Sequence, residues 1–223
     1  KITPQAILTK IQGKREKRRT ILEIFNEHNV KAKQLSGIDF SEGTVQRYEI
    51  CYSHTKNFIK WKYNREDFPL DQLNHQFIVD YEFYLKTERK CNHNSATKYL
   101  KNFKKIVRIA LANKWMDIDP FASIKFKLKQ VDAIFLTDEE LRLLINKKIK
   151  NERLSQVRDI FLFCCFTGLA FSDVKGLKNE HLSKDKEGYW WIHKKRKKTN
   201  QMSTIFVIDA ALRIIEKYKN HPE

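Results

Sequence analysis

Five consecutive basic residues, Lys194 to Lys198, form one of the densest clusters of reactive side chains in the chain. They stand between two stretches rich in aromatic and β-branched residues, 188–193 and 203–208, which predict the strands of a β-hairpin with the basic run at its tip. Guanidinium forks match phosphate oxygens, and an ammonium is a mobile point charge. On spacing alone, we favour phosphate contacts by a solvated loop over a catalytic lysine. The candidates for such contacts are Lys194, Lys195 and Arg196.

Further basic residues recur on helices predicted in the N-terminal half. A helix predicted from about Ser95 turns its apolar residues inward and presents four cations outward: Lys98, Lys101, Lys105 and Arg108. Arg47 and Lys56, on a long helix predicted around 45–59, are further candidates for groove contacts. A charged helix face is normally only solvated. The recurrence of such faces in one chain, together with the lysine-rich stretch 117–130, favours a DNA-binding surface.

The charge of the whole chain agrees with a polyanionic partner. Its 223 residues carry 44 Lys and Arg against 27 Asp and Glu, a formal net charge of +17, which is more than solubility requires. No apolar run approaches the roughly 20 residues of a membrane-spanning helix, and nothing resembles a signal peptide. We therefore expect a soluble, cytoplasmic protein, associated with the nucleoid when bound. Because the chain begins at Lys1 without an initiator methionine and ends at Glu223 just after a helical pattern, we expect it to be trimmed at both ends.

The sequence predicts neither a metal nor a cofactor. The seven histidines form no H-x-x-x-H or mixed His/Cys cluster, and no G-x-x-x-x-G-K-[ST] loop occurs. No C-x-x-C pair occurs, and two cysteines are adjacent in an apolar helix. We interpret all four as buried free thiols: Cys51, Cys91, Cys164 and Cys165.

The periodicity of apolar residues predicts a mainly α-helical protein with a small β-hairpin or sheet, organised in two domains. We place a basic helical segment at 1–36, a helical domain at 37–116, a linker at 117–131 and the start of a second domain at 132–223. A helix from about Leu154 ends at Gly168. Helix starts are predicted at capping residues: Ser41 or Thr44, Asp71 or Asn74, near Ser95, and the capping box of Thr137 and Glu140.

Several segments in a fixed order carry a resemblance to a known family. The segment Ser95–Trp115, followed by Asp119-Pro120-Phe121, looks like the last helix and exit of a SAM-like core-binding domain. Phe135-Leu136-Thr137-Asp138-Glu139-Glu140 looks like the start of an α+β catalytic domain. The stretch Phe166-Thr167-Gly168-Leu169-Ala170-Phe171-Ser172-Asp173-Val174 is similar to the first catalytic box. As an ordered set over roughly residues 40 to 219, these segments resemble tyrosine recombinases of the phage integrase type, encoded on bacterial mobile elements.

The resemblance implies a two-domain clamp on double-stranded DNA at attachment or inverted-repeat sites, with other recombinase protomers assembled on the DNA. It implies cleavage through a 3′-phosphotyrosine, which conserves bond energy and needs no cofactor. Charge builds on non-bridging oxygens while a 5′ hydroxyl leaves, so this chemistry requires cations and a proton donor. The family's His-x-x-Arg box, its later His or Trp and its tyrosine have no match in these residues. We therefore expect a fragment that binds DNA but lacks the nucleophile.

Three residues are candidates for the catalytic site. Lys198 stands on the hairpin where the family keeps a catalytic lysine, and Lys197 is its nearest rival. The family has an arginine after Gly-Leu, but Ala170 stands there. Arg158, on the helix that leads into the box, is the substitute to test, with a surface arginine paired to a carboxylate as the equal alternative. Asp173 matches the acidic position and is interpreted as orienting a cation, or alternatively as a carboxylate at a helix N-terminus.

Two classes of function remain open. The first is an integrase or transposase, a DNA strand-transferring enzyme. The second is a non-catalytic DNA-binding regulator or degenerate recombinase that keeps the architecture, an alternative that Ala170 keeps open. An RNA-binding or generic basic protein ranks below both, because no RNP-like aromatic motif or glycine-rich segment occurs.

Overall fold

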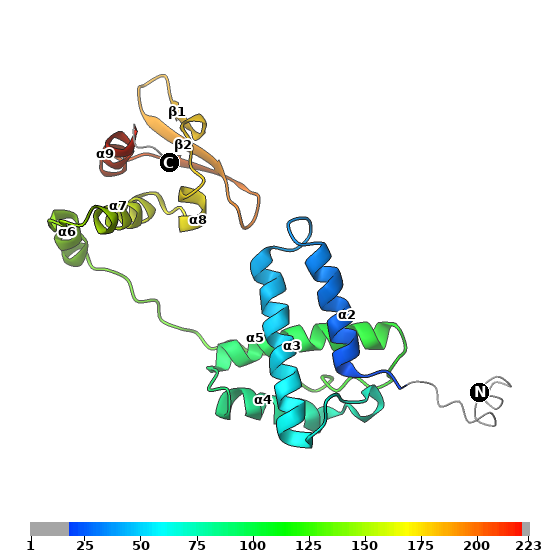
Figure 1. Ribbon diagram of the computed structural model, residues 1–223. Helices are drawn as coiled ribbons and strands as arrows, with labels where there is room; N and C mark the ends of the chain where they lie inside the picture. The colour runs from blue at the N-terminus through cyan, green and yellow to red at the C-terminus, as the bar shows by residue number, and fades with distance from the viewer. Residues whose placement is uncertain (1–17, 220–223) are drawn as a thin grey trace, which may run out of the picture. The chain divides into compact units, whose positions relative to one another are not determined.

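The computed structural model describes residues 18–219 and divides the chain into two compact units, Lys1–Asp132 and Ala133–Glu223 (Figure 1). The described part is mainly helical, with one three-stranded antiparallel sheet in the second unit. Each unit has its own buried core. The fold class predicted from the sequence is confirmed, and residues 1–17 of the predicted N-terminal segment lie outside the described part.

The first unit is built on a crossed arrangement of helices. Figure 1 shows α2 and α3 running antiparallel, joined by a short loop, with α5 crossing them. A 3-10 turn, η1 (Leu70–Gln72), precedes α4. The described helices of this unit are α2 (Ile21–Gln34), α3 (Glu42–Tyr63), α4 (His75–Thr87) and α5 (His93–Ala112).

Polar side chains set the helix starts, as the sequence predicts. The side chain of Asn74 accepts a hydrogen bond from the Phe77 amide at 3.0 Å, which satisfies a donor in the first turn of α4. Asn92 does the same for the Ser95 amide at 2.8 Å, so α5 begins before the predicted Ser95. α3 follows Ser41, one of the two predicted caps, but the Ser41 hydroxyl pairs with the Thr44 hydroxyl at 3.0 Å and makes no hydrogen bond to the backbone of the first turn.

Aromatic rings dominate the core of the first unit. Phe58, Phe77, Tyr81 and Phe103 are fully buried and come from α3, α4 and α5. The centroids of the Phe58 and Phe77 rings lie 5.0 Å apart at an interplanar angle of 84°, an edge-to-face contact. The inner face of α2 packs into the same core, so this helix of the predicted 1–36 segment is a structural part of the first unit.

The stretch predicted as a linker, 117–131, is attached to the first unit over most of its length. Phe121 is fully buried against Phe103, with ring centroids 6.1 Å apart. Beyond it, the side chain of Asn94 pairs with the backbone of Lys129, donating to its oxygen and accepting from its nitrogen, both at 2.8 Å. The alternating lysines led to the prediction of a linker, but the buried ring of Phe121 anchors this stretch to the first unit.

The second unit contains short helices around a small sheet. The capping box of Thr137 and Glu140 opens α6, as predicted: the Thr137 amide donates to the Glu140 carboxylate at 2.8 Å. Gly168 ends α7 in the left-handed conformation, with φ +67°. The described helices here are α6 (Asp138–Asn146), α7 (Glu152–Thr167), α8 (Phe171–Val174) and α9 (Asp209–Tyr218), with a 3-10 turn η2 (Asn179–His181).

The predicted hairpin is present and has a third strand at its edge. β2 (Trp190–Lys195) pairs antiparallel with β3 (Met202–Phe206), and the last pair before the loop is Lys195 opposite Met202. β1 (Leu182–Lys184) pairs with the other edge of β2. The sequence analysis did not predict β1, because three residues that include a serine and a lysine give no strand pattern.

The four cysteines differ in environment, so the prediction that all are buried is wrong. Cys51 is fully buried, and its thiol donates to the backbone carbonyl oxygen of Tyr99 at 3.3 Å. Burial raises the pKa of the Cys51 thiol to about 12. On α7, Cys164 is half-buried but its neighbour Cys165 is exposed, because the side chains of adjacent helix positions point about 100° apart.

This difference predicts selective alkylation. At pH 8 we expect iodoacetamide to modify Cys165 at least about 100-fold faster than Cys51, because the Cys51 sulfur is buried and its raised pKa leaves little of the reactive thiolate. Mass spectrometry of peptides from timed samples measures both rates. Cys165→Ser removes the fast reaction, and urea makes Cys51 reactive. Fast alkylation of Cys51 in the folded protein would contradict its burial.

Candidate nucleic-acid interface

The basic run occupies the loop between β2 and β3. The Arg196 amide donates to the Gln201 oxygen at 2.9 Å, and the Asn200 amide donates to the Arg196 oxygen at 2.8 Å. Asn200 adopts a left-handed conformation with φ +55°, which asparagine tolerates better than most residues. Lys197 and Lys198 are exposed on this closed loop.

A buried carboxylate of the short helix α8 fastens this loop to the segment that follows α7. Asp173 is only 3% exposed, and its Oδ1 accepts a hydrogen bond from the Lys197 amide at 2.8 Å. A buried carboxylate is costly unless such donors satisfy it. A second tie joins the same parts, because the Arg196 guanidinium donates to the Gly168 oxygen at 3.5 Å. The structure thus brings the predicted catalytic box, residues 166–174, next to the basic loop. Asp173 was predicted to orient a cationic side chain, but in the structure it accepts a hydrogen bond from a backbone amide.

Arg158 uses its donors within the second unit. Its Nε donates to Asp159 Oδ1 at 2.9 Å, and its guanidinium also donates to the Lys147 oxygen at 2.6 Å and to Ser155 Oγ at 3.4 Å. The side chain is 14% exposed. The geometry is that of the alternative given above, an arginine paired with a carboxylate, and a phosphate contact by Arg158 stays a prediction.

Asp159 itself is the hub that joins α7 to α9. Its Oδ2 accepts from Lys217 Nζ at 2.6 Å and from the Tyr218 hydroxyl at 2.9 Å. Burial acts to raise the pKa of Asp159, but the hydrogen bonds from Lys217, Tyr218 and Arg158 outweigh it and hold this pKa below its ordinary value of 3.8. The sequence analysis missed this hub because its partners are 58 and 59 residues away.

Of the two lysine candidates on β2, one contacts other groups of the protein and the other is exposed to solvent. Lys194 is half-buried, and its ammonium contacts the Gly176 oxygen and His181 Nε2, the latter at 3.1 Å. Lys195 is exposed. A phosphate therefore competes with internal partners for Lys194 but meets an open ammonium at Lys195.

The predicted stripe on α5 lies on one face of the helix, opposite the core. At 100° per residue, its four cations fall within about 80° of one another. Lys98, Lys101 and Arg108 are exposed. Lys105 is half-buried, and its ammonium donates to the Tyr48 hydroxyl at 2.9 Å and lies 4.7 Å from the Tyr48 ring centroid. Three of the four predicted cations are thus open to a ligand.

Arg47 and Lys56 are both exposed, but α3 does not bring them together. They are nine positions apart, and 100° per residue places them on opposite flanks of the helix. A single groove of DNA therefore meets one of them at most, if the duplex lies along one flank of α3.

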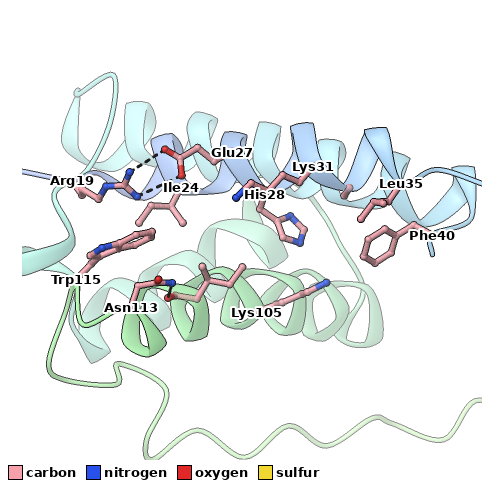
Figure 2. Close-up of a pocket in the computed structure, with 12 residues that line it drawn as sticks. Arg19, Ile24, Glu27, His28, Lys31, Leu35, Phe40, Lys105, Asn113 and Trp115 are labelled. Carbon is pink, nitrogen blue, oxygen red and sulfur yellow. Dashed lines mark hydrogen bonds and ion pairs between the residues drawn. The ribbon is translucent and has the colours of Figure 1, made fainter. Parts of the chain in front are cut away.

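The sequence analysis gave no indication of a pocket between α2 and α5 (Figure 2). Its volume is about 540 Å³. At one end the Arg19 guanidinium stacks 3.9 Å from the Trp115 ring centroid and pairs with Glu27 at 3.2 Å. Burial lowers the pKa of His28 in the same pocket, and the nearby charge of Lys105 lowers it further.

The described residues contain no group of three or more His, Cys, Asp or Glu side chains that could hold a metal ion. Within the same part of the chain, every helix is too short or too polar to cross a lipid bilayer.

Residues 20–129 match the family model described as the phage integrase SAM-like domain. The first unit is a phage integrase SAM-like domain. This assignment confirms the family expected from the motifs, and the SAM-like domain includes α2 as well as most of the stretch 117–131. No curated protein sequence matches the chain significantly.

Solved tyrosine recombinases share the fold over both units. A lambda integrase tetramer bound to a Holliday junction matches with a TM-score of 0.68 and 14% identity, over 97% of this chain and 65% of that chain. A lambda integrase dimer bound to a COC′ core site matches with a TM-score of 0.69 and 17% identity, over 97% of this chain and 63% of that chain. The Tn1549 transposon integrase in complex with a circular intermediate DNA matches with a TM-score of 0.65 and 14% identity, over 92% of this chain and 66% of that chain. The chain thus spans about two thirds of the length of these relatives.

The Asp159 hub predicts a pH-dependent loss of stability. Asp159→Asn removes a buried charge that pairs with two cations, so we expect the second unit to lose about 3 kcal/mol of unfolding free energy at pH 7. Because the pKa of Asp159 is lowered in the folded state, the wild-type advantage is complete above pH 3.8 and disappears as the pH falls through the lower, folded-state value. Urea unfolding at several pH values, followed by the NMR amide signals of α9, measures the loss at pH 7 and its dependence on pH.

Glu187→Gln, in an exposed turn of the same unit, is the control and should leave the unfolding free energy within about 0.5 kcal/mol of the wild type, as is typical of surface changes. An equal loss in Asp159→Asn at pH 7 and in strong acid would assign the effect to altered packing instead of charge.

Proposed function

We propose that this chain belongs to a site-specific tyrosine recombinase that integrates a mobile element. It binds duplex DNA at attachment or inverted-repeat sites as a two-domain clamp, together with other protomers. The observation that carries the proposal is the combination of a SAM-like domain with a second unit whose basic loop is fastened to the turn after α7. The DNA-bound lambda and Tn1549 integrases support it through their shared fold.

The proposed reaction is transfer of a DNA phosphoryl group to a tyrosine of the complete protein. The tyrosine oxygen bonds to phosphorus as the bond to the 5′ oxygen breaks, so the leaving oxygen needs a proton and the phosphoryl oxygens need cations. Lys198 is exposed on the closed loop and is the proposed proton donor. The phosphotyrosine keeps the energy of the broken bond, so no nucleotide or other cofactor is required.

The exposed cations of the two units serve as the proposed contacts to the DNA backbone. In the SAM-like domain these are Lys98, Lys101 and Arg108 on one face of α5. In the second unit, Lys195 and the loop cations supply the contacts. Salt-dependent binding follows, because each neutralised phosphate releases condensed counterions.

A non-catalytic DNA-binding regulator is the second candidate. Two observations favour it: Ala170 has no charge in the turn after α7, and Arg158 is engaged by Asp159 and by Lys147. A protein of this kind would bind DNA through the same cations and form no covalent intermediate.

The first experiment measures DNA binding by the 223-residue chain. A duplex is selected from a random pool, and its affinity is measured by fluorescence anisotropy between about 50 and 300 mM salt, where backbone contacts dominate. The triple variant Lys98→Ala, Lys101→Ala, Arg108→Ala should lower the salt slope by roughly 0.9 for each phosphate that is no longer neutralised. The control triple, Lys33→Ala, Arg89→Ala, Arg213→Ala, removes the same charge from exposed positions elsewhere. An equal decrease in both triples would show that only net charge matters.

The second experiment tests catalysis with the complete translation product of the reading frame that contains this chain. Incubated with a nicked suicide substrate built on the selected duplex, the wild type should form a covalent protein-DNA adduct on a denaturing gel. We expect Lys198→Ala to slow adduct formation by about 10² to 10⁴-fold. Lys198→Arg should not restore it, because a guanidinium does not release its proton.

A substrate with sulfur in place of the bridging 5′ oxygen separates proton donation from DNA binding. A thiolate leaves without protonation, so the Lys198→Ala defect should disappear on this substrate. Transfer of the defect to Lys197→Ala would identify Lys197 as the donor. DNA binding with no adduct from the wild type would favour the regulator.

A further inference from the structure

We propose that Arg196 is a catalytic residue that holds the phosphoryl oxygens during cleavage. This inference rests on the proposed function and adds a second group to its site. It assigns the charge that the turn after α7 lacks at Ala170 to a side chain from the neighbouring hairpin.

The position of the guanidinium is the first argument. Its Nη2 lies 3.5 Å from the Gly168 oxygen, two residues before Ala170. Its Nε donates to Ser203 Oγ on β3 at 3.0 Å. The side chain therefore extends from the end of β2 to the very turn in which a cation was expected, with Ser203 fixing one edge of the guanidinium.

The donors that Arg196 keeps are the second argument. A guanidinium has five N–H groups. Nε–H and one Nη2–H are used in the two bonds above, and among the described residues Nη1 has no acceptor. Arg196 is also exposed. It can thus present a pair of donors to a phosphate, the bidentate geometry for which arginine is suited.

Arg158, the substitute proposed from the sequence, compares poorly on the same criterion. Its donors contact Asp159, Lys147 and Ser155, and its side chain is 14% exposed. A phosphate contact would have to displace partners that also hold α7 in place. Arg196 requires no such exchange.

The fixed backbone on both sides of Arg196 is the third argument. Asp173 accepts from the Lys197 amide at 2.8 Å, and the Arg196 amide closes the loop on Gln201 at 2.9 Å. Arg196 and Lys198 are therefore held on one loop, two residues apart. A preorganised cation costs no rearrangement when charge develops on the phosphate, which is the condition for effective electrostatic catalysis.

The roles of the two side chains are distinct in the balanced step. The oxygen of the tyrosine gains a bond to phosphorus and loses its proton to solvent or a base of the complete protein, while the leaving 5′ oxygen takes a proton from Lys198. Arg196 transfers no proton. It stays charged throughout and donates hydrogen bonds to the two non-bridging oxygens, which carry more charge in the transition state than in the ground state.

The test uses the complete translation product and the suicide substrate described above. Arg196→Ala should slow adduct formation by about 10² to 10³-fold, as removal of a single transition-state donor does. Arg196→Lys should recover only a small part, because a point charge does not replace the fork. Added methylguanidinium should restore part of the Arg196→Ala rate. The matched control is Arg213→Ala, an exposed arginine of α9, which should keep the wild-type rate.

A second substrate makes the test specific to the phosphate. A methylphosphonate at the scissile position replaces one charged oxygen by a methyl group, so the wild type and Arg196→Ala should differ on it by less than about tenfold. A Ser203→Ala variant keeps the guanidinium but frees its Nε and should show an intermediate rate. DNA affinity of each variant is measured in parallel to separate binding from catalysis.

The outcomes distinguish the two proposals. A wild-type protein that forms no adduct overturns the proposed recombinase activity and this inference with it. A wild-type protein that forms the adduct, with Arg196→Ala at the same rate, overturns the role of Arg196 alone. A defect in Arg196→Ala that is equal on the phosphodiester and the methylphosphonate would also overturn it, since the hydrogen bond to the charged oxygen would then contribute nothing.

Discussion

The hydrogen bond from the Lys197 amide to Asp173 is the interaction on which the proposed site depends. A buried carboxylate without donors would be costly, and this amide at 2.8 Å is a donor that the chain supplies from the hairpin. The bond fixes the backbone near the start of a loop in which neighbouring like charges repel one another. Ordering a free residue costs about 1 to 2 kcal/mol. Because Asp173 fixes this backbone during folding, the loop cations would already be in place for the proposed contact with DNA.

The net charge of the chain conceals which cations are available. Lys105, Lys194 and Arg158 all have partners within the protein and contribute to its own structure. The exposed cations of α5 and of the hairpin loop are the ones that a polyanion meets directly. A formal charge of +17 thus predicts the class of partner, while the arrangement of internal partners decides which cations can bind it.

Features set by neighbouring residues could be predicted from the sequence. The Asn74 cap, the capping box at Thr137 and the left-handed Gly168 are local, and all three are where the pattern indicates. Features that join distant residues were not predicted. The bond between Asp173 and Lys197 spans 24 residues, and Phe121 lies in a stretch whose lysines suggest solvent. Periodicity reports which face of an element is apolar but does not identify its partner.

The pairing of Asn94 with the backbone of Lys129 shortens the free connection between the two units. It removes residues 121–129 from the flexible connection, which leaves 130–136 between the SAM-like domain and the capped start of α6. The entropy of closing a chain on itself rises with the logarithm of its free length, by about 0.6 kcal/mol for each doubling. In the proposed clamp, a side-chain amide in the first turn of α5 would therefore lower the entropic cost of holding one duplex with both units at once.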